Sequence, residues 1–210
     1  MTLVCFAVKE EARSFRRHTG AAPQISILLT GMGRANAERA VLDSLASRRP
    51  ARVLTCGFAG GLRPGLPRGA TLFETDPATG LEPALLAAGA RPARFHGSET
   101  VVSSVAQKRA LWEATQADVV EMESEFIRRI CRQKAIPSGT VRVVLDAAED
   151  ALPLDFNQLM TAGMRLDARK LAVALARSPG KIAGLLRLQR QSRAAAECLG
   201  RLLARVLLGS

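Results

Sequence analysis

Acidic residues and glycine-rich segments follow the apolar stretches of this sequence, and both can do chemistry. The acids in such positions are Glu11, Glu121, Glu123 and Asp146. A carboxyl group can transfer a proton or accept hydrogen bonds from hydroxyl groups. The glycines occur at 31–33 (GMG) and 57–61 (GFAGG). Glycine turns allow backbone N–H groups to approach an anion or a sugar closely, so together these residues predict a ligand site.

The elements that must position these residues alternate between apolar strands and helices. Strands are predicted at 1–8, 24–30, 51–55, 69–73, 118–121 and 141–145, and helices at 10–17, 36–47, 107–114, 124–133 and after Pro153. Nearly continuous apolar strands between helices favour an α/β layer structure with a largely parallel sheet. Ligands of such sheets bind beyond the carboxyl ends of the strands. We therefore expect the acids and the glycines to share one edge of the sheet.

Length and composition point to one folded domain over residues 1–210. The chain has 210 residues, of which 48% are apolar, enough for one core and too many for a disordered protein. Acids directly follow the first apolar run, and no run could cross a bilayer, so we expect a cytoplasmic protein. The four cysteines are scattered and there are only two histidines, so no metal site is expected.

The positive charge is concentrated near the C-terminus. The formal net charge is +11, and residues 163–210 hold ten Lys and Arg against two Asp and Glu. This segment is predicted to be a basic helical C-terminal extension with arginines on one side and leucines on the other. It could lie on an anionic membrane surface or pack on its own domain with a solvated basic face. Nucleic acid is not expected as a partner, because the chain has no Tyr and one Trp for stacking.

Four segments, taken in order, resemble the signature stretches of the nucleoside phosphorylase/nucleosidase superfamily. They read LLTGMGRANAERA, LTCGFAGGLRPGLPRGA, VVEMESEFIRRIC and VRVVLDAAED, and the resemblance runs from Met1 to about Phe156. It implies a three-layer α/β/α sandwich with a mixed central sheet, phosphorylase/hydrolase-like. It also implies cleavage of the N-glycosidic bond of a purine nucleoside, no cofactor or metal, and a homodimer.

The resemblance assigns a role to each acid. Glu123 matches the glutamate that binds the ribose 2′ and 3′ hydroxyls, and Met122 the methionine on the sugar face. Asp146 matches the general acid that protonates the departing purine, and Glu11 the glutamate that activates water in hydrolytic members. Glu121, Phe58 and Gly57 complete the expected substrate site. Cleavage builds positive charge on the ribose and negative charge on the base, and these groups suit both ends.

A phosphate site is expected at Gly33, Arg34, Arg52 and Thr55, with inorganic phosphate as a possible co-substrate. The phosphorylase loop usually ends in Pro-Ser, whereas Ala35-Asn36 stands here, so the nucleophile, water or phosphate, stays open. Structural interpretations also remain open. Asp146 could cap a helix and Glu123 could be a first-turn acid. Glu11, Arg34 and Arg52 could be solvated surface charges, and the glycines could be simple turn residues.

Two further features resemble the hopanoid-associated phosphorylase branch. These are a shortened segment between Phe73 and Val101 and the long basic C-terminal tail, and the sequence LPLDF at 152–156 fits the same branch. The branch implies removal of adenine from lipid-linked adenosylhopane by an enzyme at the inner face of the membrane. The alternatives are a methylthioadenosine/S-adenosylhomocysteine nucleosidase or a general purine nucleoside phosphorylase. Outside this class, a non-catalytic nucleotide- or membrane-binding module remains open.

Overall fold

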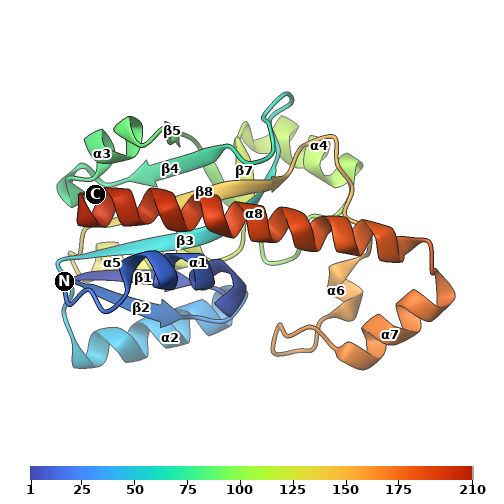
Figure 1. Ribbon diagram of the computed structural model, residues 1–210, viewed down its shortest axis with the longest axis horizontal. Helices are drawn as coiled ribbons and strands as arrows, with labels where there is room; N and C mark the ends of the chain where they lie inside the picture. Colours follow the sequence, from blue (N-terminus) through green and yellow to red (C-terminus); the bar gives the residue numbers. More distant parts are fainter. Residues whose placement is uncertain (210) are drawn as a thin grey trace.

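The computed structural model describes residues 1–209 of the chain (Figure 1). Its strands are β1 (Thr2–Phe6), β2 (Ile25–Leu29), β3 (Arg52–Gly61), β4 (Thr71–Thr75), β5 (Arg91–Pro92), β6 (Phe95–Gly97), β7 (Val119–Glu121) and β8 (Ser138–Asp146). Its helices are α1 (Lys9–Thr19), α2 (Arg34–Ser47), the 3-10 turn η1 (Pro77–Thr79), α3 (Glu82–Ala87), α4 (Val105–Thr115), α5 (Ser124–Gln133), α6 (Phe156–Leu159), α7 (Ala168–Arg177) and α8 (Lys181–Leu208).

The strands form one mixed sheet of eight strands. Its order is β2-β1-β3-β8-β4-β5, and β7 joins the ends of β3 and β6. Strands β2, β1, β3 and β8 are parallel, whereas β4 runs antiparallel to β8 and β7 antiparallel to β3. This arrangement confirms the mixed central sheet and brings the carboxyl ends of the four parallel strands to one edge.

Helices cover both faces of the sheet because side chains alternate along its strands. On β1, Leu3 and Cys5 belong to the apolar cluster that contains residues of α2 and α5. Val4 and Phe6 point to the opposite face, into the cluster that contains residues of α1, α3 and α8. The result is the expected α/β/α sandwich (Figure 1).

The last helix divides into two halves with different environments. The C-terminal half of α8 lies against α1, with Leu199 and Leu203 fully buried in the core. Its close approach requires Gly200, where a Cβ would lie 2.7 Å from the Phe15 nitrogen. The N-terminal half of α8 and all of α7 contribute no buried residue before Ala195. The last part of the predicted basic extension, residues 195–208, is thus a layer of the sandwich, whereas α6, α7 and the start of α8 extend beyond the sheet (Figure 1).

The sequence-based element boundaries are wrong in one place that matters for the site. Residues 57–61 (GFAGG) were expected to form a glycine turn, but they are the second half of β3. They stay extended because Phe58 and Ala59 pair with β8 and Gly60 and Gly61 pair with β7. The site is therefore built against a strand. No helix within residues 1–209 is long and apolar enough to cross a membrane.

Candidate active site

A pocket opens at the carboxyl ends of the parallel strands. Its walls are mainly apolar and enclose several carboxylates. It is lined by Ala7, Val8, Glu11, Met32, Phe58, Ala59, Gly60, Thr100, Val101, Val102, Val120, Glu121, Met122, Glu123, Leu145, Asp146 and Leu152. The structure thus brings together six of the predicted site residues, which are Glu11, Phe58, Glu121, Met122, Glu123 and Asp146.

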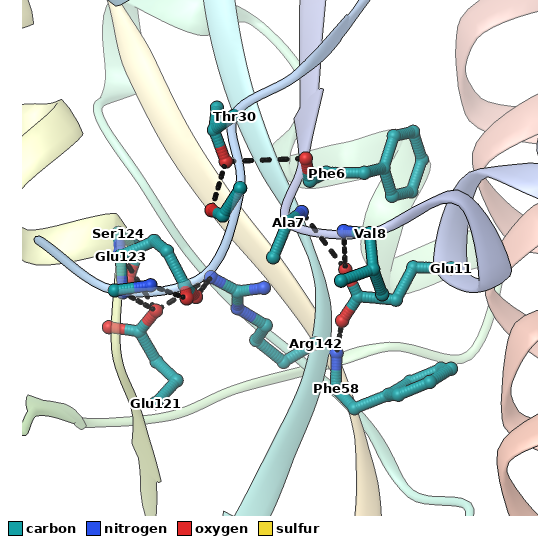
Figure 2. A network of polar contacts seen from close by, with 12 residues as sticks. Phe6, Ala7, Val8, Glu11, Thr30, Phe58, Glu121, Glu123, Ser124 and Arg142 are labelled. Atoms are coloured by element: carbon teal, nitrogen blue, oxygen red, sulfur yellow. Dashed lines mark hydrogen bonds and ion pairs between the residues drawn. The ribbon is translucent and has the colours of Figure 1, made fainter. Parts of the chain in front are cut away.

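Glu11 is held at the edge of this pocket by three backbone N–H groups. One carboxylate oxygen accepts from Ala7 at 3.0 Å and Val8 at 3.3 Å, and the other accepts from Phe58 at 3.0 Å (Figure 2). Burial raises the pKa of Glu11, while nearby Arg142 and these N–H donors lower it. Glu11 is 6% exposed, so the interpretation as a solvated helix residue is wrong.

Gly57 makes room for the charged groups beside it. A Cβ at this position would overlap the Nη1 atom of Arg142 and the Oε1 atom of Glu11, and would lie 2.8 Å from the Glu11 carboxyl carbon. Gly57 itself does not line the pocket. It acts by allowing a carboxylate and a guanidinium to approach the backbone of β3 from one side.

Arg142 is a buried cation at the centre of the acidic cluster. It projects from β8 and is 2% exposed. Its Nη2 donates to Glu121 at 2.6 Å and lies 3.5 Å from Glu123 (Figure 2). The guanidinium carries one positive charge, whereas Glu11, Glu121 and Glu123 carry up to three negative charges. The surplus of negative charge favours a ligand that is, or becomes, cationic.

Glu121 and Glu123 have different tasks although they are two residues apart. The Oε2 atom of Glu121 accepts from Arg142 and from the backbone N–H groups of Glu123 and Ser124, at 3.0 and 2.8 Å. These contacts fix the start of α5, so Glu121 orients the segment that carries its neighbour. Glu123 accepts from the Gly33 N–H at 2.9 Å and lines the pocket.

The protonation of Glu123 is sensitive to its surroundings. Burial raises the pKa of Glu123 to about 7, with Glu121 and Glu11 adding to the increase, while Arg142 and the Gly33 N–H oppose it. The group therefore exchanges its proton near neutral pH. When ionised, its two oxygens can accept hydrogen bonds from two adjacent hydroxyl groups.

Asp146 is the last residue of β8 and is paired with a lysine. The Lys108 ammonium, fully buried on α4, donates to the Oδ2 atom of Asp146. Burial raises the pKa of Asp146, and the Lys108 charge and hydrogen bond lower it. Asp146 caps no helix in this structure, so the capping interpretation is wrong.

Apolar side chains separate the acids and shape the space between them. Phe58, Met122, Val101, Val102 and Leu152 line the pocket together with the acids. A flat, apolar group such as a purine suits walls of this kind. The apolar lining also lowers the local dielectric constant around the carboxylates, which strengthens their electrostatic effect.

The four residues expected to bind phosphate do not meet. The Gly33 N–H is used by Glu123, and Arg34 pairs with Glu38 and Glu99 outside the pocket. Arg52 begins β3 at the opposite end of the sheet and donates to the Thr2 hydroxyl and the Thr79 carbonyl oxygen. Thr55 is buried in the middle of β3 and does not line the pocket.

Two residues of the site were missed in the sequence analysis. Arg142 had a visible signal, because a charged residue inside the apolar run VRVVL must find partners in the core. Lys108 had none, since it stands on a helix of mixed polarity and only the tertiary structure buries it. Within residues 1–209, no group of three or more His, Cys, Asp or Glu side chains could hold a metal ion.

The chain after β8 frames the mouth of the pocket. Asn157 exchanges two hydrogen bonds with the backbone of Val101, both 2.8 Å long. Farther along, the Gly163 carbonyl accepts from Asn36, and Met164 packs over Gly33. This segment therefore bridges the two sides of the opening before it continues into α7.

Comparison with known proteins agrees with this architecture. Residues 4–76 match the family model described as the phosphorylase superfamily. The fold of the whole chain is similar to that of futalosine hydrolase from Helicobacter pylori, with a TM-score of 0.73 and 12% identity over 100% of this chain and 97% of that one. It is also similar to 5'-methylthioadenosine/S-adenosylhomocysteine nucleosidase from Neisseria meningitidis in complex with methylthio-immucillin-A. There the TM-score is 0.71 and the identity 15%, over 100% of this chain and 99% of that one.

Proposed function

We propose that this protein is an enzyme that cleaves the N-glycosidic bond of an adenine nucleoside and releases adenine. The observation that supports this most strongly is that Glu11, Glu123 and Asp146 line one pocket. They come from α1, the start of α5 and the end of β8. The similar nucleosidase structures and the match over residues 4–76 support the same reaction class.

Each acid takes one part of the nucleoside in this proposal. Glu123 accepts hydrogen bonds from the 2′ and 3′ hydroxyls, and Met122 packs against the sugar. Asp146 donates a proton to the purine ring as the C1′–N9 bond breaks and its electron pair moves to the base. The ribose becomes cationic in the transition state, and the acidic cluster around Arg142 stabilises that charge.

We assign the nucleophile to water rather than phosphate. Glu11 lines the pocket and can take the proton that water loses when its oxygen bonds to C1′. The reaction then balances, because water loses one proton to Glu11 and the base gains one from Asp146, and adenine and a free sugar are the products. A phosphate dianion would enter a cluster of carboxylates, and Arg34 and Arg52 are engaged elsewhere.

The test is adenine release from a substrate panel, with and without inorganic phosphate. The panel contains methylthioadenosine, S-adenosylhomocysteine, adenosine and adenosylhopane, and Asp146→Asn serves as the matched control. We expect release without phosphate by the wild type, reduced by roughly a hundredfold or more in the variant. No release from any nucleoside would leave the non-catalytic binding module as the better account.

For the substrate, we propose a nucleoside attached to a lipid, with adenosylhopane as the specific candidate. The support is the surface beside the pocket mouth. Residues 160–194, here called the arm, carry eight Lys and Arg, all exposed, and one Asp. The arm also holds four of the seven large apolar side chains that are exposed within residues 1–209, which are Leu166, Val173, Ile182 and Leu186. Faster turnover of methylthioadenosine than of adenosylhopane would contradict this assignment.

We further propose that the arm binds an anionic bilayer. Its net charge of +7 suits anionic lipid headgroups. Its exposed leucine, isoleucine and valine side chains suit the boundary between the headgroups and the acyl chains. Because the arm begins at the pocket mouth, binding there would bring the active site to the lipid surface. A lipid-linked nucleoside could then reach the acids while its apolar part stays in the bilayer.

A further inference from the structure

A lysine that the proposed reaction does not use lies directly behind its general acid. Lys108 is fully buried, and its ammonium group has three donor contacts. One is to the Oδ2 atom of Asp146, and the others are to the carbonyl oxygens of Ala147 at 2.7 Å and Asp150 at 2.8 Å. All three N–H bonds are used, so Lys108 is held as a fixed cation.

The position of Lys108 follows from the local structure. Helix α4 starts with a capping box in which Ser104 and Gln107 bond to each other's backbone. Lys108, the residue after Gln107, points toward the loop that follows β8. That loop is closed by Asp150, which accepts from the Ala147 N–H at 2.7 Å.

The two oxygens of Asp146 are consequently unequal. Oδ2 accepts from Lys108, whereas Oδ1 has no hydrogen-bond partner among residues 1–209, and the side chain lines the pocket. A proton on Oδ2 would meet the ammonium hydrogen that already points there. The acidic proton of Asp146 must therefore sit on Oδ1, the oxygen left to face the base.

We propose that Lys108 is a positioning residue that directs the proton of Asp146 to Oδ1 and makes this carboxyl group a stronger acid. The inference rests on the proposed function of Asp146 as the proton donor. A nearby cation stabilises the carboxylate that remains after proton transfer. The other charged groups near Asp146 are Arg68 and Asp150, which pair with each other, and Arg187 of α8, which lines a neighbouring cavity with Asp146. Lys108 is the cation in direct contact.

The consequence concerns the range of pH in which the enzyme works. Asp146 must be protonated to act, so activity falls as the pH rises through its pKa. Lys108 lowers this pKa and thereby moves the high-pH limb of the activity profile downward. Removal of the ammonium should move that limb to higher pH, while the weaker and undirected acid reduces the plateau rate.

The test compares wild type with Lys108→Met and Lys108→Arg. Lys108→Met removes the charge and keeps a side chain of similar length. We expect the high-pH limb of the kcat/KM profile to move to higher pH by at least about one pH unit. We also expect the plateau kcat to fall. Lys108→Arg retains the charge, and its limb should stay near the wild-type position even where packing lowers the rate.

A second measurement needs no turnover. Carbon-13 NMR titration of the aspartate carboxyl groups, with Asp146→Asn to assign the signal, reports the pKa of Asp146 directly. We expect this pKa to be higher in Lys108→Met than in wild type. An unchanged value in a folded Met variant would overturn the role of Lys108. If Lys108→Met does not fold, Lys108→Arg decides the question. A rise of about one pH unit in its high-pH limb, or in the pKa of its Asp146, would overturn the role of Lys108. If the wild type cleaves no nucleoside, the proposed function fails, and the NMR titration still decides whether Lys108 controls Asp146.

Discussion

Glu123 combines a functional demand with a cost in stability. Its burial raises its pKa to about 7, against an ordinary value of 4.5. Between these two pH values the folded protein holds the proton while the unfolded chain has released it. The contribution of Glu123 to stability is thus present below about pH 4.5 and is lost as the pH rises through 7.

Glu123→Gln should therefore stabilise the protein at high pH and abolish its activity. The amide keeps an acceptor for the Gly33 N–H but carries no buried charge. We expect the free energy of unfolding at pH 8 to rise by about 1–2 kcal/mol. The loss of the ion pair with Arg142 offsets part of this gain. Urea titrations between pH 5 and pH 8 measure it.

The matched control for this prediction is Glu125→Gln. Glu125 stands in the first turn of the same helix but is exposed. Its substitution should leave the pH dependence of stability unchanged. A wild-type pH dependence that persists in Glu123→Gln would show that another buried group is responsible.

The acids of the site could be recognised in the sequence because their positions after apolar strands and the motifs around them are local features. Glu11, Glu123 and Asp146 all line one pocket, as their positions after the strands predict. The predicted phosphate residues could not be judged in the same way. Arg52 and Thr55 lie on β3, the strand that ends at the site. The length of the strand decides which of its residues reach the edge of the sheet where the site lies. Because β3 continues to Gly61, Arg52 and Thr55 do not reach that edge.

At the scale of single elements, β3 shows how a strand can serve as the floor of a site. Gly57→Ala would place a methyl group against both Glu11 and Arg142. We expect at least a hundredfold loss of kcat and a loss of about 1–3 kcal/mol in stability. Gly180→Ala is the control, because a Cβ there meets no atom within 4 Å and the residue precedes α8. Equal activity of the two variants would contradict the packing described for Glu11.

Helix α8 offers a comparison within one element. Leu199 is fully buried in its second half, whereas Leu186 is 48% exposed in its first half. Leu199→Ala should cost about 2–5 kcal/mol in the free energy of unfolding, and Leu186→Ala less than about 0.5 kcal/mol. Thermal and urea unfolding measure both. Similar losses would mean that the arm also packs in the core.

The division of α8 could not be read from the sequence. Basic and apolar residues repeat along its whole length, so an amphipathic helix was predicted without a boundary. The boundary lies at Ala195, the first buried residue of the helix. Only the tertiary structure shows that the same pattern buries its leucines near 199–203 and exposes them near 182–186.

At the scale of the whole molecule, the charge is arranged so that one end can meet an anionic surface. The protein should sediment with vesicles that contain phosphatidylglycerol in about 50 mM salt and detach in about 500 mM salt. It should not bind pure phosphatidylcholine. Arg177→Glu with Arg190→Glu, both exposed on the arm, should abolish binding without reducing turnover of a water-soluble nucleoside.

The control for membrane binding changes the net charge equally at the other end of the sheet. Arg48 and Arg49 lie just before β3. The double variant Arg48→Glu with Arg49→Glu should leave vesicle binding largely intact. Equal loss in both double variants would mean that total charge, and not the arm, attracts the protein. A concentration-dependent dimer that is lost in the arm variant would identify a second copy as the partner.

The most direct test of the proposed reaction follows the oxygen that attacks the sugar. The wild type is incubated with methylthioadenosine or another cleaved adenine nucleoside in water enriched with oxygen-18, in the presence of phosphate, and the products are analysed by mass spectrometry. We predict free adenine and a sugar that carries the heavy oxygen at C1, with Glu11→Gln strongly impaired. A sugar 1-phosphate as the product, or no adenine at all, would contradict the account.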